Sequence, residues 1–242
     1  MGAAARFLPA GDRGLVVEFE NVLSLEVNAR VRTLSLALES ARLRGLIEVV
    51  PTYRSLGVEF DPLTTSCATL QAQIEAVLAR MDPADLPAPR LVELPTVYGG
   101  AYGPDLPFVA AHAGVSEAEV IRLHSQATYH VYMIGFSAGF AYLGGLPERL
   151  HAPRLPTPRT RTPKGSVAIG GSQTGAYPAD TPGGWRIIGR TPVELFDPRR
   201  EPPTPMLPGD QVRFVPIGEA AYLRMAEQRQ SGSPDYSRKN CE

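Results

Sequence analysis

The chain has 242 residues, a formal net charge of -1, and 43% hydrophobic and 20% charged residues. This length suits one large domain or two small ones with a sizeable buried core. The charge balance shows no basic excess of the kind that binds nucleic acid or a membrane surface. No run approaches the roughly 18 apolar residues that cross a bilayer. We therefore expect a globular protein with neither a nucleic-acid nor a membrane partner.

The two cysteines, Cys67 and Cys241, are too few for a disulfide framework or a cysteine metal site. Such sparse cysteine is typical of a reducing compartment. The N-terminal sequence MGAAARFLPAGDRG lacks the apolar core of a signal peptide. These features predict a cytoplasmic protein.

Residues 1–82 predict a small α+β domain. Ser24 is the candidate N-cap of the first helix, and Gly45 is the candidate C-cap. The expected order is β-β-α-β-β-α, in which each helix covers one face of a mostly antiparallel sheet. The expected strands are 6–9, 15–19, 46–51 and 55–60, and the expected helices begin after Ser24 and at Ser66.

Residues 83–90 read PADLPAPR, a proline-rich sequence that predicts a linker. Residues 91–227 then predict a second domain rich in short strands with Gly and Pro turns, which favours a closed or nearly closed β-barrel. Ser116 and Glu119 form a candidate capping box. The polar segment 228–242 is expected to be disordered. The expected strands are 91–97, 129–134, 165–169, 185–189, 193–196 and 211–216, and the expected helices are 108–113 and 116–127.

Residues 132–191 form a glycine-rich stretch whose charge is lopsided. Asp180 is the only acid between Glu148 and Glu194. Guanidinium groups among Gly, Ser and Thr suit an anion such as a phosphate or a carboxylate. The alternatives are a solvated basic surface and arginines that pair with acids from elsewhere in the fold. The cations of the stretch are Arg149, Arg154, Arg159, Arg161, Lys164, Arg186 and Arg190.

No common catalytic motif is present, and GFSAGF lacks the spacing of a nucleophile elbow. We expect Ser137 to lie in a turn that packs Phe136 and Phe140 rather than to act as a nucleophile. Trp185, the single tryptophan, is expected to fill the barrel core, with a pocket wall as the alternative.

Several polar residues of the stretch are candidates for a site. His151 has a side-chain pKa near neutrality, so it could transfer a proton or simply be structural. Arg159 and Arg161 fall on one face of an extended segment and could clamp a phosphate or a carboxylate, or belong to a flexible basic loop. Neutral hydrogen-bond partners for a small polar ligand are Gln173, Thr174, Tyr177 and Thr181.

The segments 135–198 and 205–217, which end in ELFDP and QVRFVPI, together resemble the KipI-type family. This family is also called allophanate hydrolase subunit 1 or carboxyltransferase domain, subdomain C and D, and its bacterial members are known as the B subunit of 5-oxoprolinase. The first domain resembles the family through its layout and the segment DRGLVVEF. Ala138 stands where the family usually has proline, which removes no functional group.

The resemblance implies a small N-terminal α+β domain followed by a cyclophilin-like β-barrel. It implies one component of an ATP-dependent 5-oxoprolinase that uses ATP with Mg²⁺ and opens the lactam of 5-oxo-L-proline to L-glutamate. The implied partners are a KipA-like protein and a LamB/YcsF-like protein, which supply the other two components of that enzyme. The alternatives are an inhibitor of a sensor histidine kinase and one half of a carboxyltransferase in a urea carboxylase system.

Under this resemblance the cations would stabilise a transferring phosphoryl group, and His151 would move a proton. No metal-binding residue is expected. The expected catalytic residues are His151, Arg159, Arg161 and Lys164, and the expected substrate-binding residues are Arg154, Gln173, Thr174, Tyr177 and Thr181.

Overall fold

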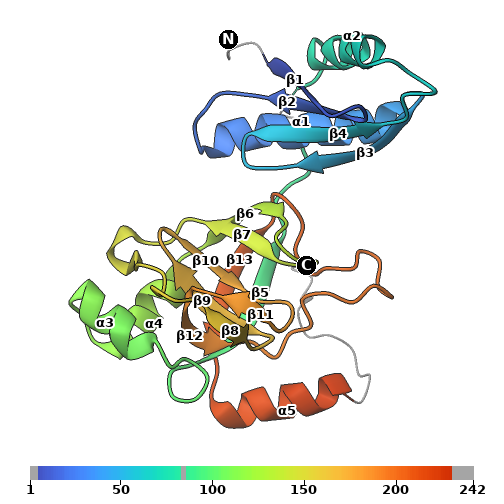
Figure 1. Ribbon diagram of the computed structural model, residues 1–242. Coiled ribbons are helices and arrows are strands. Elements are labelled where there is room, and N and C mark those ends of the chain that lie inside the picture. The colour runs from blue at the N-terminus through green and yellow to red at the C-terminus, as the bar shows by residue number, and fades with distance from the viewer. Residues whose placement is uncertain (1–4, 83–85, 231–242) are drawn as a thin grey trace. The chain divides into compact units, whose positions relative to one another are not determined.

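The computed structural model describes residues 5–82 and 86–230. The chain divides into two compact units, Met1–Ala88 and Pro89–Glu242, and each is described by itself (Figure 1). Among the helices of the described segments, none combines the length and the apolarity that a membrane span requires.

The first unit is a four-stranded antiparallel sheet in the order β1-β2-β4-β3 with two helices. Alternate residues of β2 and β4 are buried, and they share one apolar core with residues of both helices. Both helices therefore cover the same face, rather than one face each. The predicted order is confirmed: β1 (Arg6–Ala10), β2 (Gly14–Glu18), α1 (Leu25–Ala41), β3 (Leu46–Pro51), β4 (Ser55–Phe60) and α2 (Cys67–Leu78).

Local hydrogen bonds set the start of α1. The hydroxyl of Ser24 accepts a hydrogen bond from the main-chain N–H of Val27, as an N-cap does. The predicted C-cap at Gly45 is wrong, because Arg42 takes the left-handed conformation and caps the helix. Gly45 has positive φ as well, but it forms the turn into β3.

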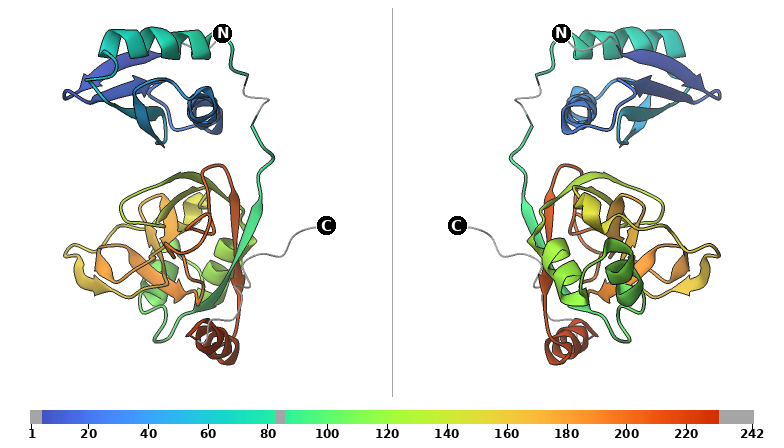
Figure 2. Two further views of the ribbon diagram at one scale, coloured as in Figure 1. Left: turned by 90° about the vertical axis from the view of Figure 1, so that its right-hand side faces the viewer. Right: turned by 90° about the vertical axis from the view of Figure 1, so that its left-hand side faces the viewer.

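The second unit is built on a closed barrel in the order β10-β7-β6-β13-β5-β12-β9 (Figures 1 and 2). The predicted barrel is confirmed. Outside it, β8 and β11 pair with each other in a two-stranded ribbon. The elements are β5 (Leu91–Tyr98), α3 (Leu106–Ala113), α4 (Glu117–Gln126), β6 (Tyr129–Ile134), β7 (Ala141–Gly144), η2 (Glu148–Leu150), β8 (Arg159–Thr162), β9 (Ser166–Gly170), β10 (Gln173–Ala176), β11 (Thr181–Gly183), β12 (Arg186–Arg190), β13 (Gln211–Pro216) and α5 (Glu219–Gln230).

Two predictions for this unit are wrong. Residues 193–196 form no strand, although burial alternates at Val193 and Leu195. Both edges of β12, which precedes them, are already paired with β5 and β9. The predicted disorder from residue 228 is also wrong as far as Gln230, because α5, rich in strong helix formers, extends to that residue. Residues 231–242 lie outside the described residues.

A buried polar chain crosses the core of the barrel. The Thr174 hydroxyl donates to the carbonyl oxygen of Ala168, so it accepts a hydrogen bond from Nε2–H of His124, 2.8 Å away. Burial lowers the pKa of His124 to about 3, so the ring is neutral. Its Nδ1 therefore accepts from the Tyr98 hydroxyl at 2.8 Å. One tautomer satisfies every partner, which makes His124 a structural residue of the core.

This arrangement predicts acid sensitivity. Below a pH of about 6.5 the unfolded chain protonates His124, while the native chain keeps it neutral to a pH of about 3. Over that range the free energy of unfolding should fall by up to about 1.4 kcal/mol per pH unit from this residue. Urea unfolding at pH 7, 6 and 5 measures it. His124→Gln should be less stable at pH 7 but show a shallower slope, whereas exposed His112→Gln should keep the wild-type slope. Equal slopes in all three proteins would contradict this account.

Candidate functional site

A second, smaller core lies on the outer face of the barrel. We call Phe140, Tyr177 and Trp185, with Ala168 and Ile187, the aromatic cluster. The adjacent strand residues Val167, Ile169 and Ile188 belong to the main core. Because side chains alternate along a strand, the aromatic cluster faces away from the barrel interior. Trp185 is 7% exposed, so it does fill a core, but the prediction that this is the barrel core is wrong, because Trp185 belongs to the separate aromatic cluster.

Two glycines let the rings of the aromatic cluster approach the strands. A Cβ atom at Gly170 would lie 2.5 Å from three atoms of the Trp185 ring. At Gly175 it would lie 3.2 Å from Phe140 and 3.4 Å from Trp185. Such contacts are too close for a side chain at Gly170, so the position of Trp185 depends on this glycine.

Gly170→Ala should therefore displace the Trp185 ring and destabilise the barrel unit by about 1–3 kcal/mol through overpacking. Trp185 is the only tryptophan, so a red shift in its emission reports the displacement directly. Gly184→Ala is the matched control, since its Cβ would meet nothing closer than 3.6 Å and it adjoins Trp185. An unchanged spectrum for Gly170→Ala would be evidence against this packing.

The carboxylate of Asp105 joins three segments beside the aromatic cluster. Nη2 of Arg159, on β8, lies 2.8 Å from each carboxylate oxygen. The main-chain N–H of Ile187, on β12, donates to Oδ2 at 2.6 Å. Asp105 precedes α3 but makes no capping hydrogen bond to it, because its oxygens bind these other partners. Nη1 of Arg159 also donates to the carbonyl oxygen of Trp185 at 3.3 Å. The guanidinium of Arg159 is thus held in one place.

The sequence did not indicate Asp105 as a site residue. The local signal, an acid immediately before a helix, indicates only an N-cap. Its partner Arg159 lies 54 residues away in the chain. Only the closed barrel brings the two together.

Asp105→Asn should lower the free energy of unfolding by about 3 kcal/mol, because it leaves the largely buried Arg159 without its anion. Thermal or urea unfolding measures the loss. Glu93→Gln is the matched control, since it breaks the half-exposed pair with Arg213 and should cost about 0–1 kcal/mol. Equal losses in the two variants would mean that the Asp105 pair is no stronger than a surface pair.

The side chains of Arg154, Arg159 and Thr162 lie near the Tyr177 hydroxyl. Burial raises the pKa of Tyr177, whereas a hydrogen bond from the main chain of Trp185 and the charges of Arg154 and Arg159 act in the opposite direction. The Arg154 guanidinium lies 5.8 Å from the centre of the Trp185 ring. A Cβ atom at Gly183 would meet both the Tyr177 hydroxyl and Oγ1 of Thr162, at 2.8 and 2.6 Å.

Two hydroxyls of the ribbon add to this polar edge. Thr162 and Thr181 are direct partners across β8 and β11. Within residues 5–82 and 86–230, Oγ1 of each is buried without a hydrogen-bond partner. Buried hydroxyls usually find a partner, so these two are exceptions to the common pattern. Sequence analysis indicated Thr181 but missed Thr162. The only sequence signal for Thr162 was its position two residues after Thr160 in an extended segment, which places both on one face.

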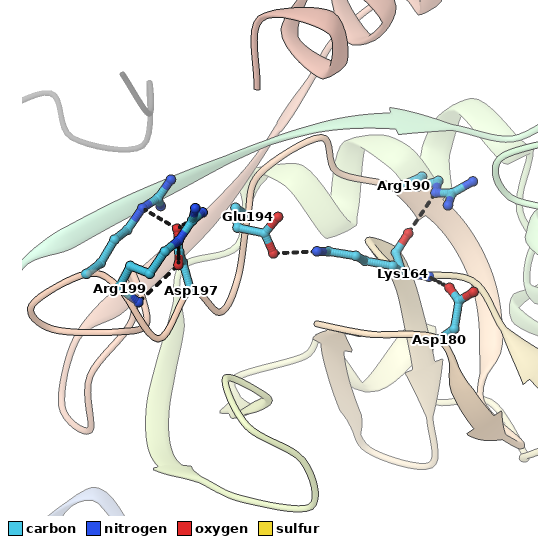
Figure 3. A network of polar contacts seen from close by, with 7 residues as sticks. Lys164, Asp180, Arg190, Glu194, Asp197 and Arg199 are labelled. Carbon is cyan, nitrogen blue, oxygen red and sulfur yellow. Dashed lines mark hydrogen bonds and ion pairs between the residues drawn. The ribbon is translucent and has the colours of Figure 1, made fainter. Parts of the chain in front are cut away.

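Lys164 belongs to a different network, in which both its main chain and its side chain are held (Figure 3). Its ammonium pairs with Glu194 at 2.5 Å, and its main-chain N–H donates to Asp180 at 2.6 Å. The carbonyl oxygen of Lys164 accepts from Nε of Arg190 at 2.8 Å. Arg161 pairs with the same Asp180 at 2.5 Å. This network attaches the segment of Glu194 to the turn after β8.

The remaining predicted residues each have different surroundings. Thr174 is fully buried inside the barrel with His124. Nε2 of His151 lies 3.2 Å from the carbonyl oxygen of Leu146. Gln173 is half-buried at the start of β10. The fold therefore brings together Arg154, Arg159, Tyr177 and Thr181, but places Arg161 and Lys164 in the second network. The roles predicted for all these residues stay predictions.

The turn GFSAGF differs in part from expectation. Phe140 is buried in the aromatic cluster, but Phe136 is 64% exposed and has a φ of 62°. The two rings still meet edge to face, with centres 5.5 Å apart. Ser137 lies in this turn, and its main-chain N–H donates to Gly135. The prediction that the turn packs both phenylalanines is wrong for Phe136.

Residues 5–206 match the family model described as "Carboxyltransferase domain, subdomain C and D". The chain belongs to this family. The match extends over most of the first unit and into the second as far as residue 206, and it includes every residue of the aromatic cluster.

Similar proteins with assigned names support membership of this family. A protein of Escherichia coli O157:H7, named as the B subunit of 5-oxoprolinase, is 42% identical over 215 residues, which are 89% of this chain and 97% of that protein. The crystal structure of TTHA0988 is 39% identical with a TM-score of 0.75, over 85% of this chain and 40% of that one. This chain therefore spans less than half of TTHA0988. The urea amidolyase of K. lactis, 22% identical with a TM-score of 0.76 over 96% of this chain and 16% of that one, shares the fold.

Proposed function

We propose that this chain is the B subunit of an ATP-dependent 5-oxoprolinase, which opens the lactam of 5-oxo-L-proline to L-glutamate in the cytoplasm. The observation that carries the proposal is the 42% identity to the E. coli protein of that name across 97% of its length. A likeness spread over nearly the whole relative supports the same role more strongly than a shared fold, which hosts many functions.

The aromatic cluster is the proposed place where substrate meets the chain. The exposed Arg154 suits an anionic group, and the buried hydroxyls of Thr162 and Thr181 suit polar atoms of a small ligand. Tyr177 and Trp185 form the apolar side of this region. Gln173 remains a candidate for orienting substrate, and His151 for moving a proton.

The active form is proposed to be an assembly with a KipA-like protein and a LamB/YcsF-like protein. Phe136 supports a protein contact near the aromatic cluster, because it is a large aromatic residue, 64% exposed, in a left-handed conformation. Exposed aromatic residues are frequent anchors of protein interfaces.

ATP and Mg²⁺ are proposed for the assembly as a whole. The cations predicted to hold the phosphates do not fit that role well within this chain. Arg159, Arg161 and Lys164 are each paired with a carboxylate: Asp105, Asp180 and Glu194 respectively. A carboxylate beside a cation cancels much of its attraction for a phosphate. We therefore assign no phosphoryl-transfer step to residues of this chain.

The proposal predicts glutamate release from 5-oxo-L-proline that requires ATP and all three proteins. Reconstitution with the KipA-like and LamB/YcsF-like proteins, with each omitted in turn, measures it. Activity should disappear with any omission. If a well-folded complete set is inactive, the proposal fails, and inhibition of a histidine kinase and carboxyl transfer from biotin become the functions to test.

A further inference from the structure

The cations of the glycine-rich stretch differ in whether a carboxylate already binds them. Three of the four cations first assigned to phosphate or substrate are paired: Arg159, Arg161 and Lys164. To recruit Arg159 for a ligand phosphate would leave the largely buried Asp105 without its cation, which is strongly unfavourable. These pairs therefore contribute little net positive charge.

Arg154 is the exception among the four. In the part of the chain that the structure describes, its guanidinium has no ion pair, and it lies 5.8 Å from the centre of the Trp185 ring. The side chain is exposed, while the ring below it is buried. The Arg159–Asp105 pair beside it is neutral overall. Of these four cations, only Arg154 therefore carries a charge that no carboxylate balances, while nearby Arg186 binds the carbonyl oxygen of Pro153 and stacks on Phe108.

One positive charge above an aromatic ring matches a particular chemical class. A guanidinium binds a carboxylate through two parallel hydrogen bonds, and stacking on the Trp185 ring holds the guanidinium of Arg154 at the surface. A triphosphate carries several negative charges and needs several cations or a metal ion. The site fits a small monoanion with an apolar ring better than it fits a nucleotide.

We propose that Arg154 binds the carboxylate of 5-oxo-L-proline at the aromatic cluster, and that a partner protein of the assembly holds the phosphates of ATP. This inference rests on the proposed function and names which of the two substrates this chain receives. The hydroxyls of Thr162 and Thr181, close to Tyr177, are covered in the structure, and they would bond the lactam amide only if the ligand displaced the groups above them.

The test is a comparison of Michaelis constants in the reconstituted three-protein enzyme. Arg154→Gln should raise KM for 5-oxo-L-proline about 10- to 100-fold, since it removes a charge-assisted bond, and leave KM for ATP unchanged. Arg149→Gln is the matched control, because Arg149 is also an exposed cation of the stretch and has no assigned role. It should leave both constants at the wild-type values. The Trp185 emission spectrum of each variant checks that the barrel is intact.

Binding to the full chain alone gives a second readout. 5-Oxo-L-proline should quench Trp185 fluorescence more strongly than 2-pyrrolidinone, which has the lactam but no carboxylate, and Arg154→Gln should abolish that difference. Titration calorimetry with MgATP should give no saturable heat.

The outcomes separate the two proposals. An inactive wild-type enzyme would reject the proposed function. An active enzyme in which Arg154→Gln raises KM for ATP, or leaves KM for 5-oxo-L-proline unchanged, would overturn the present inference alone. Saturable MgATP binding to this chain would overturn the proposal that a partner protein holds the phosphates of ATP.

Discussion

The carboxylate of Asp105 is the constraint on which the candidate site depends. It binds the guanidinium of Arg159 with both oxygens and accepts the main-chain N–H of Ile187. The start of α3, the ribbon strand β8 and the barrel strand β12 are thereby fixed to one another. Arg159 in turn bonds the carbonyl oxygen of Trp185. Asp105 thus helps to fix the positions of Arg159 and of Trp185.

Closure of the barrel explains why the site lies on its outer face. The barrel interior is filled by the main apolar core and by the hydrogen-bond chain of His124, in which the hydroxyl of Thr174 is already bonded. Glycine at position 170 leaves room for Trp185 to lie against the outer face of the strands. The β8–β11 ribbon then adds hydroxyl groups at the edge of the aromatic cluster.

The pairing of charges is consistent with the proposal that this chain acts within an assembly. The cations that looked suited to phosphate are neutralised by carboxylates, and Arg154 alone of the four keeps its charge for a ligand. Exposed Phe136 lies close to the same aromatic cluster through its contact with Phe140. A partner bound there would bring the remaining chemistry to the substrate. The division of one active site between chains is consistent with the role proposed here within a larger assembly.

The sequence by itself determined the order of elements in the first unit, the caps at Ser24 and Ser116, the barrel class of the second unit, and the family. The elements and caps depend on interactions between near neighbours in the chain, which periodicity and turn residues report. Several site features were decided only by the tertiary structure. Which acid neutralises Arg159, and whether Thr174 faces the interior, depend on which strands meet when the barrel closes. Ion pairs between residues 54 positions apart leave no local pattern, because only the closed fold brings their charges within contact distance.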